Sequence, residues 1–258
     1  MPSTRDFDLR KLNSATKYPS IPTYHALGER GILLDEHVSF DGQEVLATEK
    51  VDGTNSRIIL MPDGCYLIGS REELLYAKGD LIHNPALGIV DAIKGVAERF
   101  QSVFSTPDGV ITTVHLETYG GKTTSGAKQY TSRREFGYRM FDLSEIAVSD
   151  TNGELEQISR WREAGGQQFA EEDRLVNFAA MATLKLTPRI IPDAEIPTSI
   201  EATHQWLKRQ IPKTLVALDD EAGGRPEGLV VRTKDRSTIA KIRLEDYGRH
   251  EKRTAKRN

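Results

Sequence analysis

Cysteine is almost absent from this sequence, which has only Cys65 among its 258 residues. A single cysteine excludes an internal disulfide and any zinc cage made of cysteines, and it agrees with a reducing compartment. No apolar run approaches the roughly 18 residues of a membrane span, and the first residues, MPSTRDFDLRKLN, lack the apolar core of a secretory signal. We therefore expect a cytoplasmic protein with no membrane partner.

An excess of one charge is also missing, since the formal net charge is only -3. A polyanionic partner would need positive charge that is gathered locally. Two nucleotide-binding signatures are absent as well. Gly121-Lys122-Thr123 ends like a phosphate-binding loop, but the required first glycine falls on Leu116, and no GxGxxG follows a strand. The six histidines show no metal-ligand spacing. Any nucleotide must be bound by other means.

The sequence does contain a mixture of strand and helix patterns. Apolar runs and alternation predict strands at 44–49, 56–61, 65–70, 109–120, 135–143, 227–233 and 237–243. Helical spacing predicts helices at 85–104, 154–165, 171–184 and 199–210. Asn84 should cap the first helix with Pro85 as its first residue, and Pro62-Asp63-Gly64 should close a hairpin. Strands with interspersed helices favour an α+β fold with a largely antiparallel sheet.

The stretch TEKVDGTNSR, residues 48–57, places a lysine, an aspartate and a flexible Gly-Thr-Asn between two apolar runs. A Lys-x-Asp-Gly string arises by chance in roughly one chain of this length in fifteen, and a solvated lysine before an Asp-Gly turn explains it too. Further short motifs follow it, however, in a definite order: Ser70-Arg71, HLETYGG with Glu117, YRMFDL with Phe141, EGLVVR with Glu227, and AKIR with Lys241 and Arg243. Each alone could be an ordinary strand residue, but the ordered set indicates a function.

In this order the motifs resemble those of the covalent nucleotidyltransferases, the polynucleotide ligases and mRNA capping enzymes. The Gly-Thr-Asn at 53–55 is most similar to the RNA ligase 2-like branch, because DNA ligases usually have arginine at the position of Asn55. The resemblance extends over about residues 17–243. It implies an ATP-grasp-like nucleotidyltransferase domain, with largely antiparallel sheets flanked by helices, over residues 1–243.

Lysine suits the first step of this chemistry only when its amine is neutral. At the ordinary pKa of about 10.4, roughly one lysine amine in a thousand is unprotonated at neutral pH, so neighbouring cations and partial burial must favour the neutral form. The resemblance implies that Lys50 is the nucleophile that becomes lysyl-AMP and that Lys241 and Arg243 hold the α-phosphate. It also implies that strands 44–50 and 237–243 are neighbours.

The other site residues likewise follow from the resemblance. Glu49 is expected beside the adenine, and Asn55 is counted with the nucleotide-binding residues. Arg71 is expected to reach the ribose or the incoming 5′-phosphate, and Glu117 to accept a ribose hydroxyl. Phe141 is expected to stack on the adenine, with Tyr138 as the alternative because the register of its strand is open. Glu227 is expected to bind Mg²⁺ or Mn²⁺, which prefer carboxylate oxygen.

These expectations describe an ATP-dependent RNA ligase that joins 3′-hydroxyl and 5′-phosphate ends through lysyl-AMP and AppN intermediates. Its partner would be RNA, as single strands, a nicked duplex or an RNA/DNA hybrid. Three alternatives stay open: DNA nick joining, a nucleotide- or RNA-binding module without catalysis, and AMP transfer to another acceptor. Residues 244–258 are too few for the OB domain common in DNA ligases. This tail fits a frayed polar terminus or a flexible basic arm for phosphate backbones equally well.

Overall fold

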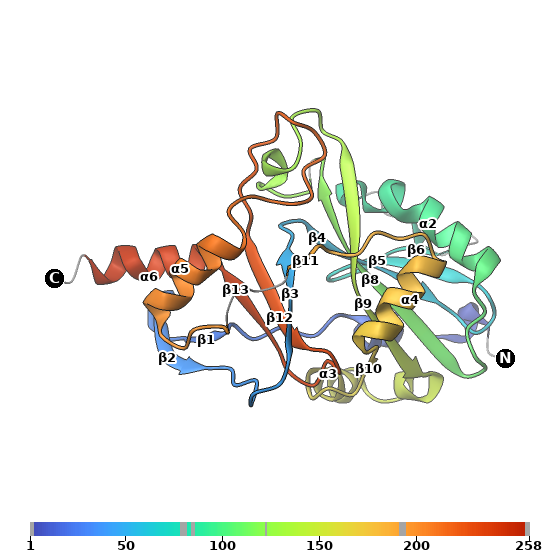
Figure 1. The fold of residues 1–258 in the computed structure, drawn as a ribbon. Helices are drawn as coiled ribbons and strands as arrows, with labels where there is room; N and C mark the ends of the chain where they lie inside the picture. Colours follow the sequence, from blue (N-terminus) through green and yellow to red (C-terminus); the bar gives the residue numbers. More distant parts are fainter. Residues whose placement is uncertain (1–2, 78–81, 84–85, 122, 191–194, 256–258) are drawn as a thin grey trace. The chain divides into compact units, whose positions relative to one another are not determined.

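The computed structural model describes residues 3–77, 82–83, 86–121, 123–190 and 195–255 (Figure 1). The chain divides into two compact units, each assembled from segments that are distant in sequence. Unit 1 consists of Met1–Ser20, Gly53–Ala127 and Arg134–Leu186, and unit 2 of Ile21–Asp52, Lys128–Arg133 and Thr187–Asn258. In the described part of the chain, none of the helices is long and apolar enough to cross a membrane.

Unit 1 is built on a seven-stranded antiparallel sheet of order β10-β9-β8-β4-β5-β6-β7. Its strands are β4 (Thr54–Leu60), β5 (Tyr66–Ser70), β6 (Leu74–Ala77), β7 (Ile82–His83), β8 (Val110–Gly120), β9 (Phe136–Ala147) and β10 (Gln168–Phe169). β8 and β9 are the longest strands, and they pair along their whole length apart from one irregularity after His115. Such an irregularity lets a side chain turn to a different face of the sheet.

Helices cover both faces of this sheet, because each face presents a separate row of apolar side chains. They are α1 (Leu9–Thr16), α2 (Ile89–Val103), α3 (Leu155–Glu163) and α4 (Glu172–Met181). α2 and α4 share a core with Ile58, Val114 and Leu116, while α1 and α3 share a second core with Ile59 and Ile111. The odd-numbered side chains of β4 and β8 therefore point to the α1 side of the sheet.

Unit 2 contains a four-stranded antiparallel sheet of order β11-β3-β12-β13 and a two-stranded sheet of β1 and β2. The strands are β1 (His25–Leu27), β2 (Leu33–His37), β3 (Val45–Lys50), β11 (Arg189–Ile190), β12 (Gly228–Thr233) and β13 (Ile239–Arg243). The helices α5 (Ile200–Gln210) and α6 (Leu244–Thr254) lie side by side in Figure 1 and pack against each other. Short 3₁₀ turns complete the fold at Thr4–Asp6, Glu29–Gly31, Ala86–Gly88, Ala127–Gln129 and Val148–Thr151.

The α+β prediction with largely antiparallel sheets is confirmed, and each predicted strand and helix has a counterpart. The predicted hairpin joins β4 to β5, with Gly64 at a φ of 76° in its turn. The helix predicted at 85–104 is α2, whose bounds are Ile89–Val103. Its expected cap, Asn84 with Pro85, lies outside the described residues. Sequence patterns did not predict the short or polar elements β1, β2, β6, β7, β10, β11, α1 and α6.

The interpretation of residues 244–258 as a frayed or flexible tail is wrong for residues 244–254, which form α6. Tyr247 is 2 % exposed and belongs to the core of unit 2. Glu245 and Asp246 occupy the first turn of α6, and Lys252 and Arg253 the last, so that the charges complement the helix dipole. The predicted domain limit at 243 stays a prediction, but α6 is an ordered part of unit 2.

Candidate active site

The four-stranded sheet of unit 2 has one apolar and one polar face. Its apolar face packs into the core of this unit with Ala47, Leu229, Val231, Ala240 and Ile242. Because side chains alternate along a strand, Lys50, Lys241 and Arg243 project from the opposite face. The structure thus places Lys50, Lys241 and Arg243 on one face of the unit 2 sheet.

Their strands are not neighbours, however, and that expectation is wrong. β12 lies between β3 and β13. Gly228 of β12 pairs with Lys50 on one side and with Arg243 on the other. Lys50 and Arg243 therefore stand in one row across the sheet, two strand spacings or about 10 Å apart.

Lys50 forms a short ion pair with the carboxylate just before β12. Its Nζ donates to Oε2 of Glu227 at 2.6 Å, and the two side chains are 25 % and 18 % exposed. Burial raises the pKa of Glu227, and the positive charge of Lys50 opposes that rise. The structure thus places two residues from motifs 177 positions apart in direct contact.

Gly228 was not among the predicted site residues, although it directly follows Glu227 in the EGLVVR motif. A Cβ at this position would lie 2.0 Å from the carbonyl oxygen of Ile242. Any side chain here would push β12 away from β13. Glycine therefore permits the close strand approach that aligns Lys50 with Arg243.

Arg243 is held by the helix that follows it. Its Nε and Nη2 donate to the two carboxylate oxygens of Asp246, both at 2.8 Å. Asp246 is buried and also lies 3.6 Å from Nη1 of Arg249. Two of the three guanidinium nitrogens of Arg243, which was expected to bind a phosphate, are thus hydrogen-bonded to a residue of α6. Nη1 is the third nitrogen.

Glu49, expected beside the adenine, has its carboxylate turned into unit 2. The side chain is 1 % exposed. It accepts hydrogen bonds from the hydroxyl of Thr214 and, at 2.8 Å, from the backbone N–H of Leu215. Glu49 therefore anchors the segment after α5 to the strand that carries Lys50.

Tyr130 is a second residue that sequence reasoning missed. Its hydroxyl oxygen accepts the backbone N–H of Asp52 at 2.6 Å, and its ring is fully buried. Burial raises the pKa of this tyrosine, so the hydroxyl stays neutral. Tyr130 holds the backbone two residues after Lys50, and no local pattern around QYTS indicates such a role.

In unit 1, Asn55 and Glu117 are direct cross-strand partners on β4 and β8. Oε1 of Glu117 accepts the backbone N–H of Gly53 at 3.2 Å. A Cβ on Gly53 would lie 2.4 Å from the carbonyl oxygen of Thr118, so the chain there requires glycine. The structure thus brings together three residues from two of the predicted motifs.

The two candidate stacking residues lie on opposite faces of the sheet. Tyr138 pairs with Thr118 and packs against the core beneath α2 and α4. Phe141 lies at the irregularity of β9, edge-on to Tyr18 at 5.0 Å between ring centroids and 6.1 Å from the ring of His115. Phe141 therefore shares the α1 side of the sheet with Glu117, while Tyr138 does not.

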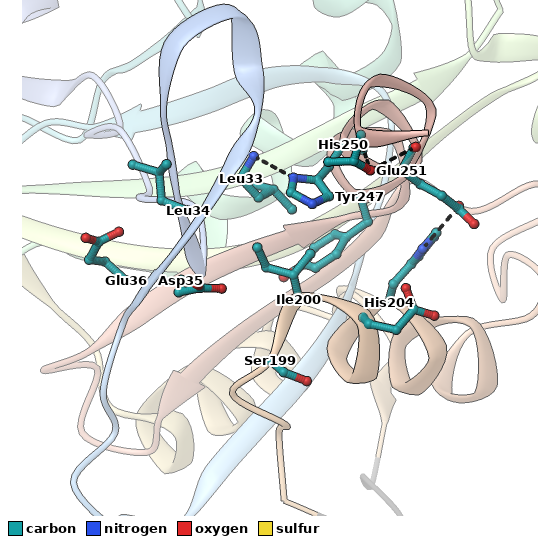
Figure 2. Close-up of a pocket in the computed structure, with 12 residues that line it drawn as sticks. Leu33, Leu34, Asp35, Glu36, Ser199, Ile200, His204, Tyr247, His250 and Glu251 are labelled. Carbon is teal, nitrogen blue, oxygen red and sulfur yellow. Dashed lines mark hydrogen bonds and ion pairs between the residues drawn. The ribbon is translucent and has the colours of Figure 1, made fainter. Parts of the chain in front are cut away.

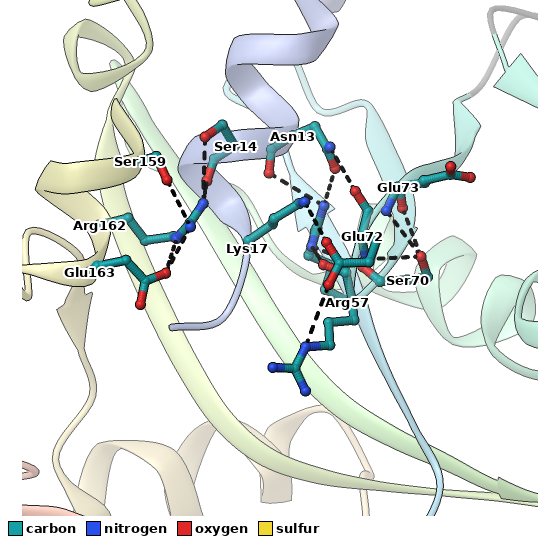
Figure 3. A network of polar contacts seen from close by, with 11 residues as sticks. Asn13, Ser14, Lys17, Arg57, Ser70, Glu72, Glu73, Ser159, Arg162 and Glu163 are labelled. Atoms are coloured by element: carbon teal, nitrogen blue, oxygen red, sulfur yellow. Dashed lines mark hydrogen bonds and ion pairs between the residues drawn. The ribbon is translucent and has the colours of Figure 1, made fainter. Parts of the chain in front are cut away.

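A polar network joins α1 to the turn from β5 to β6, the turn that contains Arg71 (Figure 3). Its side chain is 67 % exposed and lies 3.6 Å from Glu72. Arg57, fully buried on β4, donates to the carbonyl oxygens of Ser70 at 2.9 Å and Arg71 at 3.4 Å, and also to Asn13. Hydrogen bonds from the buried Arg57 thus hold the backbone of the turn that contains Arg71.

Glu227 is the residue that could hold a divalent cation. Among the described residues there is no group of three His, Cys, Asp or Glu side chains suited to a metal ion. Mg²⁺ often binds through one or two carboxylates and completes its shell with water and substrate phosphates, so a single carboxylate fits such a site.

A separate pocket of about 680 Å³ lies on the other side of the unit 2 sheet, between β2, α5 and α6 (Figure 2). His204 and Tyr247 stack in its wall, 5.6 Å apart. The N–H of Leu33 donates to Nδ1 of His250 at 3.1 Å. Lys50 projects from the opposite face of the sheet, so this pocket is not part of the Lys50 site.

Comparison with known proteins gives matches to a family model and to solved structures of similar fold. The family model described as RNA ligase matches residues 43–243. A search of curated proteins found no match.

Solved structures with a similar fold include two of a Naegleria gruberi RNA ligase and one of an archaeal ATP-dependent RNA ligase. A mutant of the former with ATP and Mn is 14 % identical, with a TM-score of 0.54 over 92 % of this chain and 63 % of that one. The same ligase with PPi is 14 % identical, with a TM-score of 0.53 over 92 % and 59 %. The archaeal ligase is 18 % identical, with a TM-score of 0.52 over 93 % and 51 %. The chain thus spans between half and two thirds of these proteins, and the likeness confirms the nucleotidyltransferase fold.

Proposed function

Because this chain belongs to the RNA ligase family, we propose that it joins RNA 3′-hydroxyl and 5′-phosphate ends at the expense of ATP. The observation that carries this proposal is the contact of Lys50 with Glu227 at 2.6 Å on the polar face of the unit 2 sheet. Partial burial and further cations on the same face are surroundings that suit a lysine nucleophile, and the carboxylate of Glu227 fixes the position of the amine before the reaction.

In the first step, Nζ of Lys50 attacks the α-phosphorus of ATP. A P–N bond forms, the P–O bond to the β-phosphate breaks, pyrophosphate leaves and the amine loses its proton. An amine that donates to a carboxylate holds its proton, so the pair with Glu227 must open before the attack. Lys241 and Arg243 then offset the negative charge that develops on the phosphates.

In the second step, an oxygen of the RNA 5′-phosphate attacks the phosphorus of lysyl-AMP. The P–N bond breaks, Lys50 regains a proton and the AppN end forms. In the third step, the RNA 3′-hydroxyl attacks the 5′-phosphorus, loses its proton and displaces AMP, which leaves a phosphodiester. ATP supplies the energy of all three steps, and no further co-reactant is needed.

Glu227 is the proposed ligand for Mg²⁺ or Mn²⁺. The cation would supply charge neutralisation at the phosphates of ATP. The carboxylate that would hold the cation is the one that accepts from Nζ of Lys50 in this structure.

The residues of unit 1 keep their proposed roles. Glu117 would accept a ribose hydroxyl, Phe141 would stack on the adenine, and Arg71 would contact the ribose or the RNA 5′-phosphate. Asn55 would contact the nucleotide through its amide. For Glu49, whose carboxylate is engaged by Thr214, the proposed contact with the adenine passes to its backbone.

Labelling with α-labelled ATP and a divalent metal, followed by a denaturing gel, tests the nucleophile. Wild-type protein should acquire an acid-labile label, and Lys50→Ala should lose it at least 1,000-fold, because no other side chain replaces a covalent nucleophile. Lys234→Ala is the matched control, since Lys234 is an exposed lysine of the same unit. Equal labelling of Lys50→Ala, or no labelling of wild type, would refute the mechanism.

A second assay identifies the acceptor. The labelled protein is offered 5′-phosphorylated RNA, 5′-phosphorylated DNA and nicked RNA/DNA hybrids, and we expect joining with an RNA strand. Joining of DNA alone would identify a DNA nick-joining enzyme. Labelled protein that joins no strand would favour AMP transfer to another acceptor, and nucleotide binding without any label would favour a binding module.

A further inference from the structure

A row of three polar side chains crosses the sheet of unit 1 beside the start of β4. Asn55 on β4 pairs with Glu117 on β8, and Glu117 pairs with Arg139 on β9. Directly paired residues of antiparallel strands point to the same face, with Cβ atoms about 5 Å apart. Arg139 therefore stands next to Glu117 on the face that carries the predicted nucleotide-binding residues, although no motif assigns it a role.

Two atoms of this row are buried without a hydrogen-bond partner among the described residues. They are the amide oxygen of Asn55 and Nε of Arg139. Within that part of the chain, Arg139 also forms no ion pair, not even with Glu117 beside it. A buried polar atom without a partner costs about 1–3 kcal/mol, and more when the group is charged. Such atoms at one place indicate a ligand that completes them.

Two buried arginines of unit 1 differ from the half-buried Arg139 in their terminal nitrogens, although Nε of Arg57 also lacks a partner in the described part of the chain. The terminal nitrogens of Arg57 donate to oxygens of Ser70, Arg71 and Asn13. Arg162 donates to Glu163 at 2.7 Å and to the carbonyl oxygen of Ser14 at 2.6 Å. Both arginines have internal structural acceptors, whereas Arg139 has none within the described residues.

The chemistry of the row defines the missing ligand. A guanidinium presents parallel N–H donors that match the oxygens of a phosphoryl group. The amide of Asn55 and the carboxylate of Glu117 accept hydrogen bonds from hydroxyl groups. A sugar phosphate carries both phosphoryl oxygens for the guanidinium and sugar hydroxyls for Asn55 and Glu117. Inorganic phosphate has no sugar hydroxyls.

We propose that Arg139 binds a phosphoryl group of a nucleotide, with Asn55 and Glu117 receiving hydroxyl hydrogens of the attached sugar. The proposal rests on the proposed ligase function and adds to it a binding residue that lies within the YRMFDL motif but to which the resemblance assigns no role. The phosphoryl group belongs either to the adenine nucleotide or to the 5′ end of the RNA, and the experiment separates these two sources.

The experiment measures binding rather than joining, with the full chain. In one arm, the dissociation constants of AMP and adenosine are compared by calorimetry. In the other, those of a short 5′-phosphorylated RNA and the same RNA with a 5′-hydroxyl are compared. Wild type should prefer the phosphorylated ligand in at least one arm, and Arg139→Met should reduce that preference about 10- to 100-fold. The arm that changes identifies the source of the phosphate.

Two further variants make the result interpretable. Arg160→Met removes an exposed arginine of α3 that pairs with Glu156, and it should leave both preferences unchanged. Arg139→Lys keeps the charge without the fork, so it should retain part of the preference even if Arg139→Met proves unstable. A preference that survives in both Arg139 variants, or that wild type lacks in both arms, overturns the proposal.

Failure of this proposal and failure of the ligase function remain distinguishable. Wild type that binds AMP through Arg139 but forms no lysyl-AMP would remove the ligase mechanism and keep the binding residue. If wild type is labelled on Lys50 but the Arg139 variants keep the full preference for the phosphorylated ligand, only the role of Arg139 is refuted.

Discussion

In the contact between Lys50 and Glu227, two opposing effects act on the carboxyl group of Glu227. Burial raises the pKa of Glu227, so the neutral carboxyl form is favoured there more than at the surface, while Lys50 favours the charged form. An ion pair of two half-buried groups gains more than an exposed pair, but its desolvation cost offsets much of that gain. Such a pair can open at modest cost, as the attack by the amine requires.

Single substitutions can also distinguish between Phe141 and Tyr138, the two candidates for adenine stacking. A base stacked on an aromatic ring contributes about 1–3 kcal/mol. Phe141→Ala should therefore raise the KM for ATP in lysyl-AMP formation about 5- to 100-fold, and Tyr138→Ala should change it less than threefold, since Tyr138 packs on the opposite core. The measurement is the ATP dependence of labelling. A larger effect from Tyr138→Ala would assign the stacking role to Tyr138 instead.

At the scale of elements, α1 is joined to the sheet by a charged side chain rather than by apolar packing alone. Arg57 of β4 reaches Asn13 near the end of α1 and also the β5–β6 turn (Figure 3). Burial, and after it the nearby charge of Arg162, lowers the pKa of Arg57 to about 9, so that it stays charged at neutral pH. A Cβ on Gly69 would lie 2.9 Å from its Nε, so the glycine leaves room for this arginine.

Replacing this link should loosen both elements. Arg57→Met leaves partly buried acceptors on Asn13 and Ser70 without their donor, and it should lower the free energy of unfolding by about 2–4 kcal/mol. Denaturation in urea, followed by circular dichroism, measures the loss. The exposed control Arg160→Met should stay within about 0.5 kcal/mol of wild type. Equal stability of the two variants would show that the Arg57 network contributes little.

Sequence patterns do not predict elements such as α6, because tertiary packing rather than local sequence makes them form. α6 has the sequence LEDYGRHEKRT, in which Leu244 and Tyr247 are the apolar residues. Its polar composition suggested a tail, but burial of Tyr247 and the bonds between Asp246 and Arg243 hold it on unit 2. Short helices are marginal in isolation, and tertiary contacts decide whether they form.

At the scale of the whole molecule, histidines make stability depend on pH. Burial lowers the pKa of His25 and of His204 in the folded protein. The unfolded chain then binds more protons than the folded one at any pH between those lowered values and the ordinary value of about 6.5. The free energy of unfolding should therefore fall as the pH drops below about 6.5, and thermal melting at pH 7.5 and pH 5.5 should show a lower Tm at the acid value.

The matched variant for this prediction carries His25→Gln and His204→Gln together. The charged and titratable groups that influence His204 are Glu251, Glu201 and Lys208, and those around His25 include Asp35 and His37. Without the two imidazoles, the difference in Tm between the two pH values should shrink. An unchanged difference would assign the acid sensitivity to carboxylates instead.

The sequence by itself determined the class of fold and the longer strands and helices, and the resemblance carried by its ordered motifs marked Lys50 as the candidate nucleophile. Apolar periodicity and short motifs are local properties, so they can be read from neighbouring residues. The tertiary structure alone decided that β12 separates the strands of Lys50 and Arg243, that Asp246 engages Arg243, and that Tyr130 holds Asp52. Strand order, register and buried hydrogen bonds depend on residues that are distant in sequence, and no local pattern encodes which of them will meet.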